Sequence, residues 1–161
     1  MGAMDTNVER RRLLQSLVAA GVMLGPAACS QKPRVYNMQV SRDVGCLCCH
    51  AWAELMEQSG RFKISLTDGE DLPALKQRLG VPSGFGACHA GVVEGYVIEG
   101  HVPAEDILRL LEERPAGIRG LAVPGMPRGS PGMEQPDGTR DAYEVYAFKA
   151  NGETSIFARH V

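Results

Sequence analysis

The chain has 161 residues, of which 44% are hydrophobic and 22% are charged, and its formal net charge is −2. This length suits one compact domain with a targeting segment, and the apolar content is enough for a core that does not depend on disulfides. The composition excludes a disordered or fibrous protein. Because the charge is near neutral and no basic patch is evident, we expect no nucleic-acid partner.

The first 30 residues have the features of an export leader. Three arginines, Arg10 to Arg12, precede an apolar stretch over residues 13–28, which is shorter than the roughly 20 residues that a membrane-spanning helix needs. The arginines resemble a twin-arginine signal, and Ala27-Ala28-Cys29 resembles the end of a lipoprotein box. We therefore expect a periplasmic protein with a leader over residues 1–30, a candidate lipid anchor at Cys29, and a folded domain over residues 31–161. An uncleaved membrane-anchoring helix is the alternative.

After the leader, the hydrophobic pattern alternates between the period of strands and the period of helices. Gly60 and Gly80 stand where the first two helices would end. In chain order we expect a strand from Tyr36 through Val40, a helix over Cys49 to Ser59, a strand over Phe62 to Leu66, a helix over Asp71 to Leu79, a pair of strands at Gly91–Val93 and Tyr96–Ile98, and a helix over Pro103 to Glu113.

The last third of the chain begins with a region rich in glycine and proline, Gly117 to Met133, which predicts a long loop. Asn151-Gly152 then separates two alternating runs, Tyr143 to Phe148 and Thr154 to Phe157, as in a β-hairpin. A β-α-β block followed by β-β-α is the thioredoxin order. The predicted fold class is therefore α/β, with a thioredoxin-like mixed sheet, helices on both faces, a long Gly/Pro loop and a C-terminal β-hairpin.

The chain has five cysteines, and three of them, Cys46, Cys48 and Cys49, fall within four residues. A disulfide framework would be more evenly spread, and neighbouring cysteines cannot easily bridge each other. Cys46 and Cys49 have the C-x-x-C spacing of thiol redox proteins and lie where a strand leads into a helix. The helix N-terminus favours a thiolate over a thiol, and a thiolate is both a nucleophile and a metal ligand.

Soft thiolates select Cu(I), Zn(II) or iron–sulfur clusters. With Cys88 from a later segment, the three clustered cysteines could enclose one soft ion or a small thiolate-bridged cluster, and copper is the best match in an exported protein. Met126, Met133 and His89 are further candidate ligands for copper. The methionines could equally fill the core, and His89 and His50 could equally be exposed or capping residues, whereas a capping or packing role is expected for His101.

Two other functions fit the same cysteines. A thiol–disulfide oxidoreductase would use Cys46 and Cys49 as its redox pair. A structural zinc site would use four thiolates, which makes zinc the alternative to copper.

Several stretches of the sequence resemble the CopG family of bacterial copper-resistance proteins, and they span nearly all of the domain. They are Cys46-Leu47-Cys48-Cys49 with Trp52 downstream, Ala87-Cys88-His89, the run from Gly95 to Pro103, and the run from Gly120 through Met133. Several long matches in the same order are more specific than any single motif.

The resemblance implies a periplasmic protein of thioredoxin-like fold that binds copper through the C-x-C-C cysteines and the later cysteine. It also implies a multinuclear Cu(I) cluster, a redox role in copper handling, and other periplasmic copper-handling proteins as partners. Two residues depart from the family pattern. Members commonly carry Gly where this chain has Leu47 and often carry Gly where it has His50, so Leu47 would alter the turn and His50 could add a nitrogen ligand.

Overall fold

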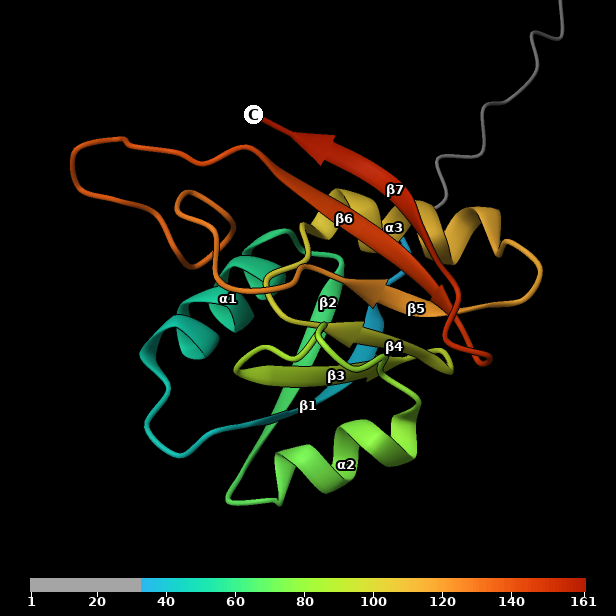
Figure 1. Ribbon diagram of the computed structural model, residues 1–161. Helices are drawn as coiled ribbons and strands as arrows, with labels where there is room; N and C mark the ends of the chain where they lie inside the picture. The colour runs from blue at the N-terminus through green and yellow to red at the C-terminus, as the bar shows by residue number, and fades with distance from the viewer. Residues whose placement is uncertain (1–32) are drawn as a thin grey trace, which may run out of the picture. The chain divides into compact units, whose positions relative to one another are not determined.

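The computed structural model describes residues 33–161, so the expected leader and Cys29 lie outside the described residues. The described part forms a single seven-stranded sheet and three helices (Figure 1). The strands are β1 (Tyr36–Arg42), β2 (Phe62–Asp68), β3 (His89–Val93), β4 (Tyr96–Glu99), β5 (Ile118–Ala122), β6 (Tyr143–Lys149) and β7 (Thr154–His160); the helices are α1 (Leu47–Gln58), α2 (Leu72–Leu79) and α3 (Ala104–Glu113).

The strand order is β2-β1-β3-β4-β5-β6-β7. Strand β1 runs parallel to β2 and antiparallel to β3, and β4 is antiparallel to β3. This four-stranded part, with its crossover through α1, is the expected thioredoxin-like arrangement, so the predicted fold class is confirmed. Strands β5, β6 and β7 extend the sheet beyond β4.

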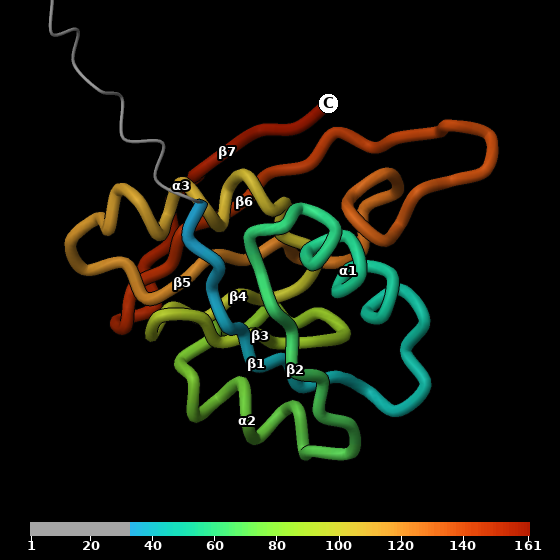
Figure 2. Tube along the Cα trace, turned by 180° about the vertical axis from the view of Figure 1, so that it is seen from behind, coloured from blue at the N-terminus to red at the C-terminus, as the bar shows by residue number. Residues whose placement is uncertain are grey.

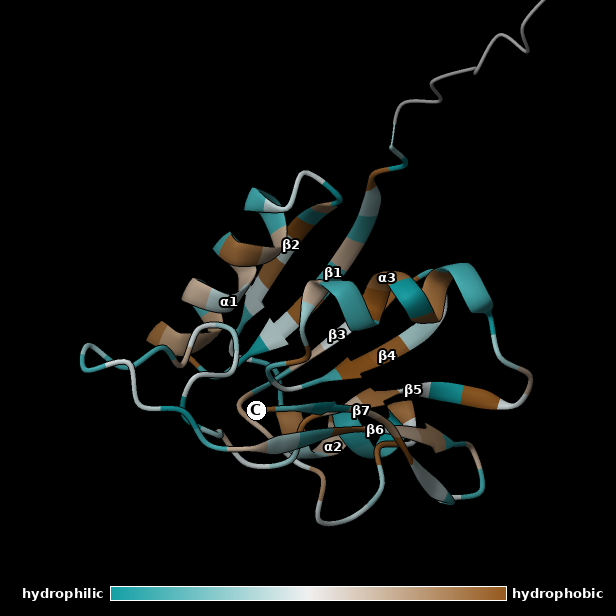
Figure 3. Cartoon of the chain, turned by 90° about the horizontal axis from the view of Figure 1, so that it is seen from above, coloured by the Kyte–Doolittle hydropathy of each residue, from teal (hydrophilic) through white to brown (hydrophobic). Residues whose placement is uncertain are grey.

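Helices cover both faces of the sheet, and Figure 2 shows α2 on the side away from α1 and α3. The main core lies under α1 and α3 and includes Trp52 and Met56 of α1 together with Ile107 and Leu110 of α3. A smaller cluster on the face of α2 is built around Phe148. Figure 3 shows α3 banded in apolar and polar residues, as expected for a helix with one buried face.

The helix ends follow the capping residues in the sequence. Asp71 caps α2 by accepting a hydrogen bond from the Ala74 N–H at 3.1 Å, and Gly80 ends the helix in the left-handed conformation at φ 78°. Helix α1 begins at Leu47, two residues before the predicted start, with Cys46 as its N-cap. The Cys46 sulfur therefore takes the position that a serine or aspartate oxygen usually occupies.

The Gly/Pro loop is present but begins later than the sequence indicated. Residues 118–122, predicted as loop, form β5, which runs parallel to β4 and antiparallel to β6. Gly120 permits this pairing, because a Cβ atom there would lie 2.0 Å from the Val97 carbonyl oxygen. Glycine usually interrupts a strand, but Gly120 has no side chain and so lets β4 and β5 approach closely.

We predict that Gly120→Ala destabilises the fold, because either β4 or β5 must move to relieve the clash. The loss should reach about 3 kcal/mol, the upper end of the range for overpacked cores. Gly86→Ala is the matched control, because no atom lies within 4 Å of a Cβ there and its φ is not in the left-handed region. Urea unfolding of the two variants measures the difference, and equal midpoints would contradict the argument.

Candidate metal and redox site

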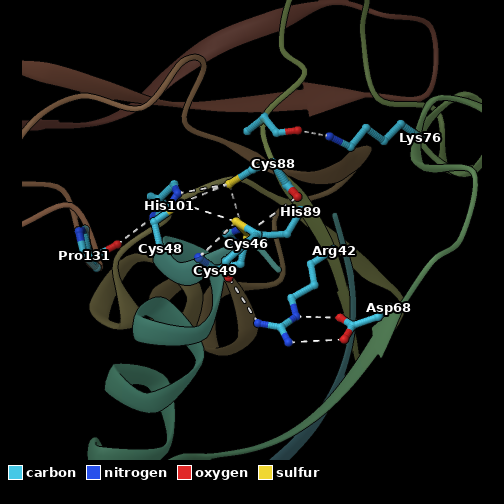
Figure 4. The surroundings of a disulfide bond; sticks show 11 residues. Arg42, Cys46, Cys48, Cys49, Asp68, Lys76, Cys88, His89, His101 and Pro131 are labelled. Carbon is cyan, nitrogen blue, oxygen red and sulfur yellow. Dashed lines mark hydrogen bonds and ion pairs between the residues drawn. A yellow bond between two sulfur atoms is a disulfide. The ribbon is translucent and has the colours of Figure 1, made fainter. Parts of the chain in front are cut away.

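The cysteine site lies where the turn between β1 and α1 meets the start of β3. Cys46, Cys48 and Cys49 occupy the N-cap and first turn of α1, and Cys88 immediately precedes β3. Antiparallel pairing places Arg42 opposite His89, and the Asp43 N–H donates to the Cys88 carbonyl at 3.3 Å. The expected convergence of Cys88 with the early cysteines is confirmed, as Figure 4 shows.

The four sulfur atoms all lie within 4.8 Å of one another. Cys46 and Cys49 are joined by a disulfide, while Cys48 and Cys88 are free thiols. The Cys48 Sγ lies 3.4 Å from the Cys46 Sγ and 3.8 Å from the Cys88 Sγ. Sulfurs around a tetrahedral metal with bonds of about 2.3 Å are separated by a little under 4 Å. The spacing therefore suits a metal site once the disulfide is reduced.

His101 belongs to this site, although its sequence context favoured a capping or packing role. Its Nε2 lies 3.3 Å from the Cys88 Sγ, and its Nδ1 lies 2.7 Å from the Pro131 carbonyl oxygen. A carbonyl only accepts, so Nδ1 carries the hydrogen and the neutral ring turns the Nε2 lone pair toward the thiol. Burial lowers the pKa of His101, which favours this neutral form. The sequence offered no spacing signal for His101, because 12 residues separate it from Cys88.

His89 is fully buried, with its Nδ1 3.5 Å from the Cys88 Sγ and its ring against Trp52 at a centroid distance of 4.5 Å. Its Nε2 has no hydrogen-bond partner within residues 33–161. Cys88, His89 and His101 together form a second group whose ligand atoms lie close enough to hold a metal ion. Burial, with smaller contributions from His101 and Lys76, lowers the pKa of His89 to about 3.

His50 and Leu47, the two departures from the family pattern, both face away from the sulfurs. His50 is exposed and pairs with Glu54, with 3.2 Å between the His50 Nε2 and Glu54 Oε1. Leu47 is 84% exposed. Its side chain therefore extends into solvent, while Gly45 supplies the positive φ, 75°, in the turn before α1.

The Gly/Pro loop lies over the first turn of α1. A Cβ atom on Gly132, whose φ is 82°, would lie 2.7 Å from the Cys48 carbonyl oxygen and 2.8 Å from the Trp52 nitrogen. The loop backbone thus contacts the cysteine-bearing helix directly, one residue before Met133. Met133 is partly buried and Met126 is 51% exposed. Their role as copper ligands remains a prediction.

A buried ion pair holds the segment that carries Cys88. Lys76 Nζ lies 2.7 Å from Glu99 Oε1, and Glu99 is fully buried. The same carboxylate oxygen accepts from the Ala87 N–H at 2.6 Å, and the Lys76 ammonium donates to the Ala87 carbonyl. Burial raises the pKa of Glu99, and the Lys76 and Ala87 hydrogen bonds oppose that rise. Both polar groups of the Ala87 backbone are therefore fixed one residue before Cys88.

On the opposite side, Arg42 fixes the turn that carries Cys46. Its guanidinium makes two hydrogen bonds to Asp68, at 2.6 and 3.3 Å, and a third to the Cys46 carbonyl at 3.1 Å (Figure 4).

Burial, and secondarily the Cys48 sulfur, raise the pKa of Cys88 to about 12. In the metal-free protein Cys88 is therefore a thiol, which donates to the neutral His101 ring. A bound cation would reverse this preference by stabilising the thiolate.

We predict that His89 makes the stability of the metal-free protein fall in acid. Its folded pKa is about 3 and its ordinary value is 6.5, so the unfolded chain takes up the proton first. The stabilisation is complete above pH 6.5 and is lost as the pH falls toward 3, at up to about 1.4 kcal/mol per pH unit. His89→Phe keeps a ring against Trp52 without this proton. Denaturant unfolding across that range should show the shallower slope for the variant, and parallel curves would contradict the prediction.

Comparison with known proteins agrees with the geometry. A family model described as a protein of unknown function, DUF411, matches residues 85–133. No curated relative matches the chain. None of the helices in residues 33–161 is long and apolar enough to cross a membrane.

Two solved structures are similar to this chain over most of its length. One, named copper resistance protein CopG, form 1, is 45% identical with a TM-score of 0.72 and covers 80% of this chain and 98% of its own. The other, form 2 of the same-named protein, is 45% identical with a TM-score of 0.73 and covers 81% of this chain and 100% of its own. With this identity over an almost complete match, the chain belongs to the CopG family of copper-resistance proteins.

Proposed function

We propose that this protein binds Cu(I) through the thiolates of Cys46, Cys48, Cys49 and Cys88 as part of copper resistance. The observation that carries the proposal is the convergence of four cysteine sulfurs within 4.8 Å at one helix N-terminus. Sulfur and imidazole donors, with no carboxylate among them, suit a soft ion such as Cu(I) and not Mg²⁺ or Ca²⁺. Four thiolates in so small a volume also suit a thiolate-bridged multinuclear cluster. Zinc is the competing metal.

Reduction of the disulfide is part of this function. While Cys46 and Cys49 are bonded to each other, only Cys48 and Cys88 can supply thiolates. Reduction adds two thiolates at the positive end of α1, whose first turn holds no acidic residue. His101 and His89 would supply nitrogen donors beside Cys88, and Met133 and Met126 would supply thioethers from the Gly/Pro loop. Copper affinity therefore depends on the redox state of the protein.

We also propose that the protein acts in the periplasm. The export features of residues 1–30, the lipoprotein-like Cys29 and the family of copper-resistance proteins support this location. An oxidising compartment is also where a Cys46–Cys49 disulfide persists between reductions. Other periplasmic copper-handling proteins would deliver or receive the metal.

For copper binding, we predict that the reduced chain holds Cu(I) more tightly than the chain with its disulfide intact. Cys88→Ser and Cys48→Ser should each weaken binding by more than about 10-fold, the loss that even residues supporting a metal ligand produce. Anaerobic competition with a chromophoric Cu(I) chelator measures these affinities, and metal analysis under the same conditions separates copper from zinc.

His50→Ala is the matched control for the copper titration, because His50 lies in the same helical turn but pairs with Glu54. Its affinity should equal that of the unmodified chain. The proposal fails if a chain with serine at all four cysteine positions binds Cu(I) as tightly as the reduced protein.

A second candidate function, thiol–disulfide oxidoreductase, is favoured by the disulfide itself. Cys46 is partly exposed and Cys49 is fully buried, so an external thiol reaches only Cys46 and expels Cys49 at the helix N-terminus. If this is the function, Cys49→Ser should abolish insulin reduction while Cys48→Ser and Cys88→Ser leave turnover unchanged. Turnover that needs all four cysteines would argue against a simple two-cysteine enzyme.

A further inference from the structure

The two free thiols of the site lie next to the disulfide in a specific order. From Cys46 the sulfur-to-sulfur distance is 3.4 Å to Cys48, and from Cys48 it is 3.8 Å to Cys88. Each thiol is therefore already close to the sulfur with which it could exchange, and exchange proceeds by attack of a thiolate on a disulfide sulfur. No external thiol is needed to begin such a sequence.

We propose that the chain carries out internal thiol–disulfide exchange, in which Cys48 relays the disulfide from the Cys46–Cys49 pair to a Cys48–Cys88 pair. This activity goes beyond copper binding, because it needs no metal. It makes Cys48 and Cys88 a second redox pair and not only two metal ligands.

In the first step the Cys48 thiolate attacks the Cys46 sulfur. The Cys46–Cys48 bond forms, the Cys46–Cys49 bond breaks, and its electron pair leaves on Cys49. Attack on Cys49 instead would join two neighbouring cysteines inside a helix, which disulfide geometry disfavours. The Cys49 sulfur then has an acceptor for its regained hydrogen, because the Cys88 carbonyl oxygen lies 3.6 Å away.

The Cys46 side chain can turn during this step while Arg42 holds the Cys46 carbonyl in place. Cys46 is the N-cap and lies outside the helix, with extended backbone at ψ 103°. Leu47, between the two cysteines that become bonded, is 84% exposed. Cys49, by contrast, is fully buried and stays in place as the leaving sulfur. The Cys46 sulfur can therefore move toward Cys48, while Cys49 stays in place as the exchange requires.

In the second step Cys88 passes its proton to the His101 Nε2, which lies 3.3 Å from its sulfur, and attacks the Cys48 sulfur as a thiolate. The Cys48–Cys88 bond forms, and the Cys46–Cys48 bond breaks with its electron pair leaving on Cys46. Protons lost from Cys48 and Cys88 are returned to Cys49 and Cys46, so the sequence consumes no oxidant, reductant or net proton. One disulfide and two thiols are present before and after, and the C-x-x-C pair ends in its reduced form.

The tryptic map of the chain reports this exchange directly. Cleavage after Arg42, Arg61, Arg78 and Arg109 places Cys46, Cys48 and Cys49 in the peptide 43–61 and Cys88 in the peptide 79–109. A disulfide among the first three cysteines stays within one peptide. Any disulfide that includes Cys88 joins the two peptides and is seen by its mass.

The experiment uses the full chain carrying Cys29→Ser, oxidised to one disulfide per molecule, without copper or added thiol and without oxygen. After incubation in mildly alkaline buffer, acid quenching and alkylation, we expect the joined peptides in the otherwise unmodified chain, with two free thiols per molecule throughout. Cys48→Ser should lose the joined peptides, and Cys88→Ser should instead hold a Cys46–Cys48 disulfide with Cys49 alkylated.

Two outcomes overturn the proposal. The absence of joined peptides from the unmodified chain would show that the disulfide stays on Cys46 and Cys49. Joined peptides forming equally fast in Cys48→Ser, and in Cys48→Ala as a second variant, would show that Cys88 attacks directly and that Cys48 relays nothing. Neither outcome bears on Cu(I) affinity of the fully reduced chain, so the exchange and copper binding succeed or fail separately.

Discussion

The site depends first on the antiparallel pairing of β1 with β3. This pairing places Arg42 opposite His89, so the residue before β3 lies beside the residues that follow β1. Cys88 thereby lies next to a turn some 40 positions earlier in the chain. The backbone hydrogen bond from Asp43 to the Cys88 carbonyl closes this junction. Sulfur convergence is therefore a property of the sheet register, and a slip of one residue would turn Cys88 to the other face.

The second constraint is the Lys76–Glu99 pair, which connects α2 and β4 to the backbone at Ala87. Two charges taken out of water are costly unless hydrogen bonds satisfy them, and here the Ala87 backbone supplies both a donor and an acceptor. Because the other carboxylate oxygen of Glu99, Oε2, is buried without a hydrogen-bond partner in residues 33–161, we assign the pair chiefly to positioning the loop at Ala87. On the other side, Arg42 pairs with Asp68 and donates to the Cys46 carbonyl. An ion pair therefore positions the backbone next to Cys88 and another positions the backbone at Cys46.

These ion pairs surround sulfurs that remain free to change bonding state. Cys49 is buried on the inner face of α1, Cys46 and Cys48 are partly exposed, and Leu47 is turned outward. In the metal-free protein, burial keeps Cys88 protonated against a neutral His101. The free Cys48 and Cys88 sulfurs could instead bind a soft cation or exchange with the neighbouring Cys46–Cys49 disulfide. The proposed metal binding and the proposed thiol exchange would therefore use the same four sulfur atoms and exclude each other at any one moment.

The sequence by itself determined the fold class, most helix ends and the identity of the clustered cysteines, because these follow from local periodicity, capping residues and adjacency along the chain. Gly60 and Gly80 marked the ends of α1 and α2, and the C-x-x-C spacing marked the two cysteines that form the disulfide. Only the tertiary structure decided the rest. Strand β5 exists because Gly120 permits contact with a distant strand, and His101 joins the site because the Pro131 carbonyl and the Cys88 sulfur meet its ring from separate segments. Such contacts depend on packing between segments that are distant in the sequence, so the local sequence pattern cannot predict them.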